Sequence, residues 1–221
     1  MATTTQSADT KKKTTKKKAT KKSAVAADRP RVVVDQRSEL RAWLAEHHEH
    51  ENGVWVVTRK KNAGGTVSWN DIVEEALCVG WIDSLPRAID EQQSMLLLTP
   101  RRPGSKWSAK NKAHVDVLRE RGLLRPAGLT AIARAQADGT WEALDAVSRL
   151  EMPVDLAAAL AALVGAREFW DAFPPSARRG ILEWIDAARR PETRAARIDQ
   201  TARGAARNER ALQWPPKPTP A

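Results

Sequence analysis

Proline and glycine recur through the second half of the chain and restrict it to short helices. The breakers stand at Pro126, Gly139, Pro153, Gly165, Pro174, Pro175 and Pro191. A proline inside a helix removes a hydrogen bond and clashes with the preceding turn, and glycine weakens a helix interior. The runs between these breakers favour helix, most clearly the alanine-rich Leu156–Leu163. The second half is therefore predicted to be all-helical.

The first half mixes helix and strand signals. Leu40, Trp43, Leu44 and His47 recur at helical spacing behind Ser38, a suitable N-cap. Further helices are predicted from Ser68 through Leu77 and from Ser108 to Arg121, and strands at Val54–Lys60, near Trp81–Ser84 and near Ser94–Thr99. The chain is thus predicted to be an α+β protein. A small β-sheet with helices in the N-terminal half continues into an all-helical C-terminal half.

The net charge of +10 is concentrated at the N-terminus. Residues 1–31 hold ten Lys or Arg against two Asp, whereas the other 190 residues hold 27 basic and 25 acidic groups. The run Lys11–Lys22 has almost no apolar side chains and its like charges repel, so we expect disorder. Four regions are expected: a disordered Lys-rich tail at 1–31, an α+β region with a ligand site at 32–135, a helical region at 136–210 and a Pro-rich disordered end at 211–221.

A flexible polycation neutralises phosphates without reading a base sequence. The tail therefore suggests non-specific nucleic-acid binding through Lys11, Lys12, Lys13, Lys16, Lys17, Lys18, Lys21 and Lys22. Its pattern of lysine runs separated by threonine resembles the lysine-rich tails of bacterial nucleoid proteins. Two alternatives stay open: a solubilising tail without a partner, and attraction to an anionic membrane surface, although no apolar wedge accompanies the run.

Composition excludes several classes of protein. The single cysteine rules out an intrachain disulfide and a cysteine-based metal cluster. The N-terminus lacks the apolar stretch of a signal peptide, and no run approaches the length of a membrane span. We therefore expect a cytoplasmic protein, while the oligomeric state is left open.

Two neighbouring blocks carry the side chains best suited to a ligand site. The apolar run Ala76–Val79 leads into Gly80-Trp-Ile-Asp83, and a loop marked by proline and glycine follows at 99–112. Arginine offers a planar fork to carboxylate or phosphate, a helix N-terminus favours anions, and tryptophan offers a stacking face. The predicted ligand-binding residues are Trp81, Asp83, Arg101, Ser105, Trp107, Ser108 and Asn111.

The same residues also permit other interpretations. In the first of these, Arg101 forms an ion pair with Asp83 that holds the loop against the sheet, and Ser108 only caps a helix. Asp83 would alternatively act as a general base if desolvation raised its pKa. No second carboxylate, histidine or activated nucleophile is tied to Asp83 by local sequence, so no catalytic residue is assigned.

The remaining reactive side chains are expected to be structural. Cys78 lies among apolar residues and is predicted to be an inert core thiol, and His114 to be structural or exposed. A helix would place His47 and Glu51 four residues apart, within a cluster that includes His48 and His50. No His-Glu-x-x-His motif is present, so a solvated helix end is expected instead of a metal site. No metal and no cofactor are predicted.

The order and spacing of Gly80-Trp-Ile-Asp83 and Thr99-Pro-Arg101, followed by Trp107-Ser108 and Asn111, resemble the YdeI/OmpD-associated family of bacteriocin-protection proteins. The resemblance spans roughly residues 36 to 205, and its helical part is weaker evidence than these motifs. The family usually has an aromatic residue where this chain has Val79. The resemblance implies a role in tolerance to bacteriocins or cationic antimicrobial peptides.

These observations favour a non-catalytic cytoplasmic protein of that family, which binds a small anionic ligand or a partner. One alternative is an enzyme acting on a small anionic metabolite, with Asp83 as base and Arg101 as charge stabiliser. Another is an adaptor tethered to nucleic acid through the Lys-rich tail.

Overall fold

The computed structural model describes residues 29–49 and 51–212, and the chain divides into two compact units. The first unit runs to Ser105 and includes Asn111–Asp138, and the second comprises Lys106–Lys110 and the chain from Gly139 onward. The predicted lysine contacts of the tail, the Pro-rich end beyond residue 212 and His50 lie outside the described residues. Within the described residues, the α+β architecture with an all-helical second half is confirmed.

The first unit is built on a four-stranded sheet in the order β1-β2-β4-β3. Its strands are β1 (Arg31–Val33), β2 (Val54–Arg59), β3 (Trp81–Ala88) and β4 (Gln93–Pro100). β1 runs parallel to β2, while β4 pairs antiparallel with β2 and β3. The three-residue β1 was not predicted, because so short a segment carries no periodic pattern. β3 continues beyond the predicted Ser84, because pairing with β4 resumes after an irregularity between Asp83 and Leu85.

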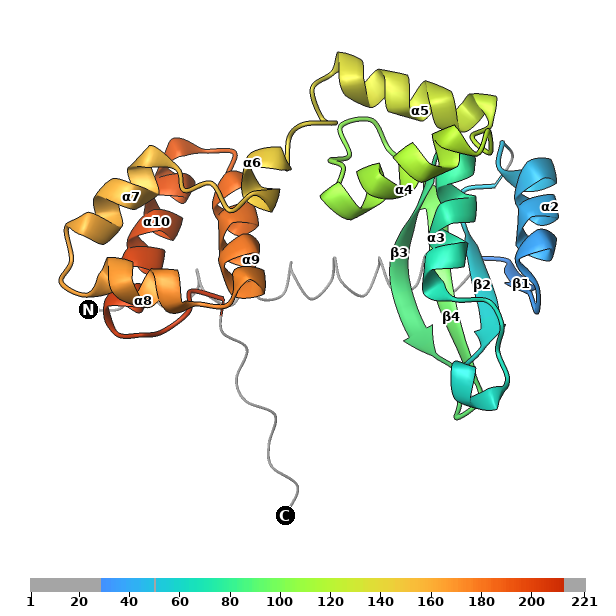
Figure 1. The fold of residues 1–221 in the computed structure, drawn as a ribbon, viewed down its shortest axis with the longest axis horizontal. Helices are drawn as coiled ribbons and strands as arrows, with labels where there is room; N and C mark the ends of the chain where they lie inside the picture. Colours follow the sequence, from blue (N-terminus) through green and yellow to red (C-terminus); the bar gives the residue numbers. More distant parts are fainter. Residues whose placement is uncertain (1–28, 50, 213–221) are drawn as a thin grey trace, which may run out of the picture. The chain divides into compact units, whose positions relative to one another are not determined.

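Two helices, α2 (Arg37–His47) and α3 (Trp69–Cys78), pack beside this sheet (Figure 1). Their apolar side chains form one buried cluster with alternate residues of β2 and β4. The helices contribute Leu40, Leu44, Ile72 and Ala76, and the strands contribute Val54, Val56, Leu96 and Leu98. The prediction that Ser38 is the N-cap of α2 is wrong. The N-cap is Gln36, two residues earlier, because the Glu39 carboxylate accepts the Gln36 N–H at 3.2 Å.

The start of α3 follows the sequence signal. Asp71 donates its backbone N–H to Ser68 Oγ at 3.2 Å, and Ser68 returns its own N–H to the Asp71 carboxylate at 2.8 Å. This reciprocal pair satisfies two N–H groups that lack helical partners. The predicted capping of α3 by Ser68 is therefore confirmed.

Two further helices, α4 (Ala109–Glu120) and α5 (Pro126–Ala137), complete the first unit, apart from the first two residues of α4. The backbone of α5 approaches the end of α3 very closely at Gly128. A Cβ atom there would lie 2.4 Å from the Cys78 carbonyl oxygen, a distance no side chain tolerates. Gly80 has φ +74°, a left-handed conformation that turns the chain from α3 into β3. These two glycines therefore set the position of β3 and the loop after β4.

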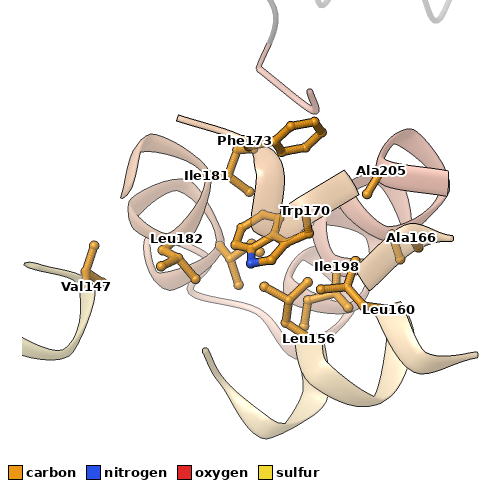
Figure 2. Close-up of a cluster of buried hydrophobic side chains, with 12 residues drawn as sticks. Val147, Leu156, Leu160, Ala166, Trp170, Phe173, Ile181, Leu182, Ile198 and Ala205 are labelled. Atoms are coloured by element: carbon orange, nitrogen blue, oxygen red, sulfur yellow. The ribbon is translucent and has the colours of Figure 1, made fainter. Parts of the chain in front are cut away.

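The second unit is a cluster of five helices: α6 (Asp145–Ser148), α7 (Val154–Ala161), α8 (Ala166–Ala172), α9 (Pro175–Asp186) and α10 (Pro191–Ala206). They begin or end close to the breakers seen in the sequence. Trp170 lies at the centre of their core, surrounded by Leu156, Leu160, Ile181, Leu182 and Ile198 (Figure 2). The ring of Phe173 meets it edge-on, with centroids 6.3 Å apart.

Candidate functional site

The residues predicted to bind a ligand are divided between the two units. Trp81, Asp83, Arg101, Ser105 and Asn111 belong to the first unit, whereas Lys106–Lys110, which contains Trp107 and Ser108, belongs to the second. The loop after β4 is thus not one continuous structural element.

Arg101 is fixed at the point where β4 ends. Its backbone N–H donates to the Gly80 carbonyl at 3.0 Å, and its Nη1 donates to Ser105 Oγ at 3.1 Å. Arg134 on α5 donates to the Arg101 carbonyl at 3.0 Å. Burial lowers the pKa of Arg101 to about 10, although the Asp83 carboxylate raises it and the Arg134 charge lowers it further. The structure brings Arg101, Ser105 and Asp83 into one electrostatic neighbourhood, with the guanidinium buried.

The two tryptophans predicted to form a stacking wall are both buried. Trp81 donates its indole N–H to the His48 carbonyl at 3.2 Å and meets Trp43 edge-on. Trp107 lies in the second unit beside Trp141, with ring centroids 4.9 Å apart. Neither indole offers an open ring face to a ligand, because each is at least 98% covered. Ser108 and Asn111 are half-buried.

The first unit holds a charged network that sequence reasoning missed. Glu75 on α3 is only 1% exposed, and its carboxylate accepts hydrogen bonds from Arg37 and Arg41 on α2. Burial lowers the pKa of Arg37, but its hydrogen bonds to Glu75 and Glu74 outweigh this effect and leave it above its ordinary value. Glu74 also contacts His114 Nδ1 at 3.1 Å. Every carboxylate here is paired with a cation, so the network serves to neutralise a buried charge.

A cavity of about 300 Å³ adjoins this network and is lined in part by Arg41, Glu75 and Cys78. The Cys78 thiol is not activated, because burial raises its pKa to about 11. His47 and His48 each place Nδ1 2.8 Å from a carbonyl of their own helix. No group of three His, Cys, Asp or Glu suited to a metal ion occurs among the described residues.

We expect Cys78 to react slowly and to make stability depend on pH in the alkaline range. The folded thiol keeps its proton to about pH 11, whereas the unfolded thiol releases it near pH 9.0, so stability should fall as the pH rises between these values. Cys78→Ala should remove this fall and cost about 1 kcal/mol. Denaturant unfolding across pH 8 to 11 and labelling with Ellman's reagent measure both. Labelling of the native protein at the rate of a free thiol would contradict the buried assignment.

A further opening on the first unit lies between the sheet and the start of α3. This basic groove has a volume of about 660 Å³. It is lined by Thr58, Arg59, Lys60, Lys61, Val67, Ser68, Trp69, Ile72, Pro86, Arg87, Ala88, Ser94, Met95 and Leu96. Lys61 opens the short 3-10 turn η1 (Lys61–Ala63), which lies beyond the ends of β2 and β4 (Figure 1).

The groove is unusual in charge and in exposure. Four of its lining residues carry cationic side chains, Arg59, Lys60, Lys61 and Arg87, and none of the lining residues is Asp or Glu. The Arg87 guanidinium itself lies over the Trp55 ring, 5.0 Å from its centroid, on the face of the sheet opposite α3. Trp69 is 46% exposed, and it is the only exposed tryptophan among those that the structure describes. The sequence signal was the run Arg59-Lys60-Lys61 after a strand, but nothing local linked it to Trp69 or Arg87.

The fold thus defines a protein that joins an α+β unit with a basic groove to an all-helical unit. The helical unit carries a YdeI/OmpD-associated family domain, because residues 149–208 match the family described as "Bacteriocin-protection, YdeI or OmpD-Associated". The family recognised from the sequence is therefore confirmed. Residues 32–131 match a separate family, described as a domain of unknown function (DUF8412). No curated protein and no solved structure matches the chain.

The two matches place the sequence motifs in a different family from the one that they resemble. Gly80-Trp-Ile-Asp83 and Thr99-Pro-Arg101, which carried most of the resemblance, fall within the domain of unknown function. The match to the bacteriocin-protection family falls on the helical part, which is the weaker part of the sequence resemblance. None of the described helices is long and apolar enough to cross a membrane.

Proposed function

We propose that this protein is a non-catalytic binding protein whose α+β unit holds an anionic ligand in the basic groove. The observation that carries the proposal is the gathering of Arg59, Lys60 and Lys61 around one opening with no carboxylate in its lining. Like charges repel one another, so their convergence is unfavourable unless an anion offsets it.

The surroundings of Arg59 and Lys60 leave most of their charge available. Arg59 pairs with Asp35 at 3.3 Å, but both side chains are more than half exposed, so the pair is weak. Lys60 donates to the Asp90 backbone carbonyl, which is a neutral group, at 2.7 Å. The Asp90 carboxylate itself accepts the N–H groups of Gln92 and Gln93, each at 2.7 Å. An incoming phosphate or carboxylate would therefore meet an electropositive groove.

Titration of the full-length protein with inorganic triphosphate by calorimetry tests this proposal. Lys61→Glu should weaken binding about tenfold or more, because it replaces an attraction by a repulsion in the groove. Arg121→Glu is the matched control: it makes the same change in charge on the same unit, outside the groove lining. The Lys-rich tail is identical in both variants, so its contribution cancels. Equal losses in the two variants would reject a specific groove site.

Asp83, Arg101 and Ser105, the members of the predicted loop site that lie together in the first unit, remain a second candidate ligand site. The buried Arg101 guanidinium supports it, because a desolvated cation gains from a neighbouring anion. The rival interpretation is that Asp83 and Arg101 only stabilise the fold. A double-mutant cycle with Asp83→Asn and Arg101→Lys, measured by melting, separates them. Strong coupling in stability, without any loss of triphosphate affinity, would leave these residues a structural role.

The family description supports a role in tolerance to bacteriocins, exercised from the cytoplasm through the bound ligand. Survival of a sensitive bacterial host that expresses the protein, compared with its Lys61→Glu variant, tests whether tolerance depends on the groove. Non-specific nucleic-acid binding by the Lys-rich tail is a further proposal, supported by the charge of residues 1–31. The enzymatic alternative, with Asp83 as base, would require turnover that Asp83→Asn abolishes.

A further inference from the structure

We infer that the basic groove recognises a nucleotide unit, with an aromatic base against Trp69 and a phosphate among the cations. The inference rests on the proposed function and names the chemical class of the anion. The shared chemistry is a planar base joined to phosphate, and it has two sources: a free mononucleotide, or one unit of a single-stranded nucleic acid.

Trp69 is the first observation behind this assignment. A tryptophan usually buries its large apolar area, yet this one is 46% exposed at the first residue of α3. Its position in the groove lining gives the exposed ring a neighbouring concave surface. An exposed indole beside a positively charged groove is the arrangement that single-strand binding proteins use to stack bases.

The cations form the second observation. Lys60 and Lys61 leave the end of β2, and Trp69 enters α3 after the chain has turned back at η1. Arg87 lines the groove from β3, but its guanidinium lies 5.0 Å from the centroid of the Trp55 ring, on the opposite face of the sheet, and is not counted among the groove's charges. The charge thus comes from the end of β2 and from the turn η1. Several of these cations would contact the phosphate of a bound nucleotide, while its base would stack on Trp69.

The size and floor of the groove are the third observation. Its volume of about 660 Å³ lies in the range of small-molecule sites and leaves room for a base and a sugar-phosphate together. Val67, Ile72, Pro86 and Leu96 supply apolar lining, while Thr58 and Ser94 supply hydroxyl groups. A bare inorganic anion would use the cations but not this apolar lining. A ligand with a planar ring uses both.

The test compares three ligands on the full-length protein by calorimetry: inorganic triphosphate, thymidine monophosphate and a short oligothymidylate. Trp69→Ala should weaken binding of at least one thymine-bearing ligand about tenfold, and leave triphosphate affinity within about twofold. Trp69→Phe should restore much of the loss, because phenylalanine also stacks. Leu129→Ala is the matched control, because Leu129 is equally exposed, at 46%, on α5 of the same unit.

Each outcome has one consequence. Loss of oligothymidylate affinity assigns the groove to a strand, and loss confined to the monophosphate assigns it to a free nucleotide; both support the inference. If Trp69→Ala changes neither thymine ligand while Lys61→Glu still weakens triphosphate, the nucleotide assignment is wrong and the anion site stands. If no affinity responds to Lys61→Glu, the proposed function fails as well. Circular dichroism of each variant verifies that the fold is kept.

Discussion

Replacing Glu75 with alanine is expected to destabilise the α+β unit by about 3–5 kcal/mol. Glu75 is 1% exposed and its carboxylate holds the guanidinium groups of both Arg37 and Arg41. Removing Glu75 takes from Arg41 its buried counter-charge and leaves Arg37 paired only with Asp71 and Glu74. The cavity left by the buried side chain adds to this cost. Because a small domain is stable by only about 5–15 kcal/mol, this loss would take a large share of the total. Denaturant unfolding followed by tryptophan fluorescence measures it.

The control for this experiment is an ion pair on the surface. Asp199 and Arg203 lie four residues apart on α10, at 2.8 Å, with both side chains more than half exposed. Asp199→Ala should cost less than about 1 kcal/mol, because water already screens such pairs. If Glu75→Ala cost no more than Asp199→Ala, the network around Glu75 would not be a stabilising element of the fold.

Trp170→Ala should have an effect of similar size on the helical unit, about 3–5 kcal/mol. The indole is 1% exposed and contacts helices on several sides of the core, so its removal leaves a cavity that the short helices cannot easily close (Figure 2). Thermal unfolding followed by far-ultraviolet circular dichroism measures the loss of helix. Val164→Ala, at a side chain that is 99% exposed, should change stability by less than about 0.5 kcal/mol. A comparable melting temperature for both variants would argue against a core centred on Trp170.

The N-cap of α2 could not be predicted from the intrinsic preferences of neighbouring residues alone. Ser38 and Gln36 both stand near the start of the apolar pattern, and serine is the better intrinsic cap. The structure selects Gln36, because the Glu39 carboxylate binds the N–H groups of Asp35 and Gln36 and so begins the helix earlier. At α3 the local signal and the structure agree, since Ser68 and Asp71 satisfy each other without help from distant residues.

The candidate site shows the larger gap between sequence and structure. The loop after β4 was predicted to form a ligand site because it concentrates arginine, serine and tryptophan within a few residues. Its tryptophan, Trp107, is buried, and its backbone is divided between two units. The basic groove combines Lys61, Trp69 and Leu96, which no local motif connects.

By itself, the sequence determined the class of fold and the positions of most helices and strands. These features depend on hydrophobic period, on breakers and on caps, which act over a few neighbouring residues. Only the tertiary structure decided which side chains are buried, which cations converge and that Glu75 is neutralised. Those properties depend on contacts between segments distant in sequence, such as the pairing of β2 with β4 that places Thr58 beside Ser94 in the groove lining and the packing of α2 on α3.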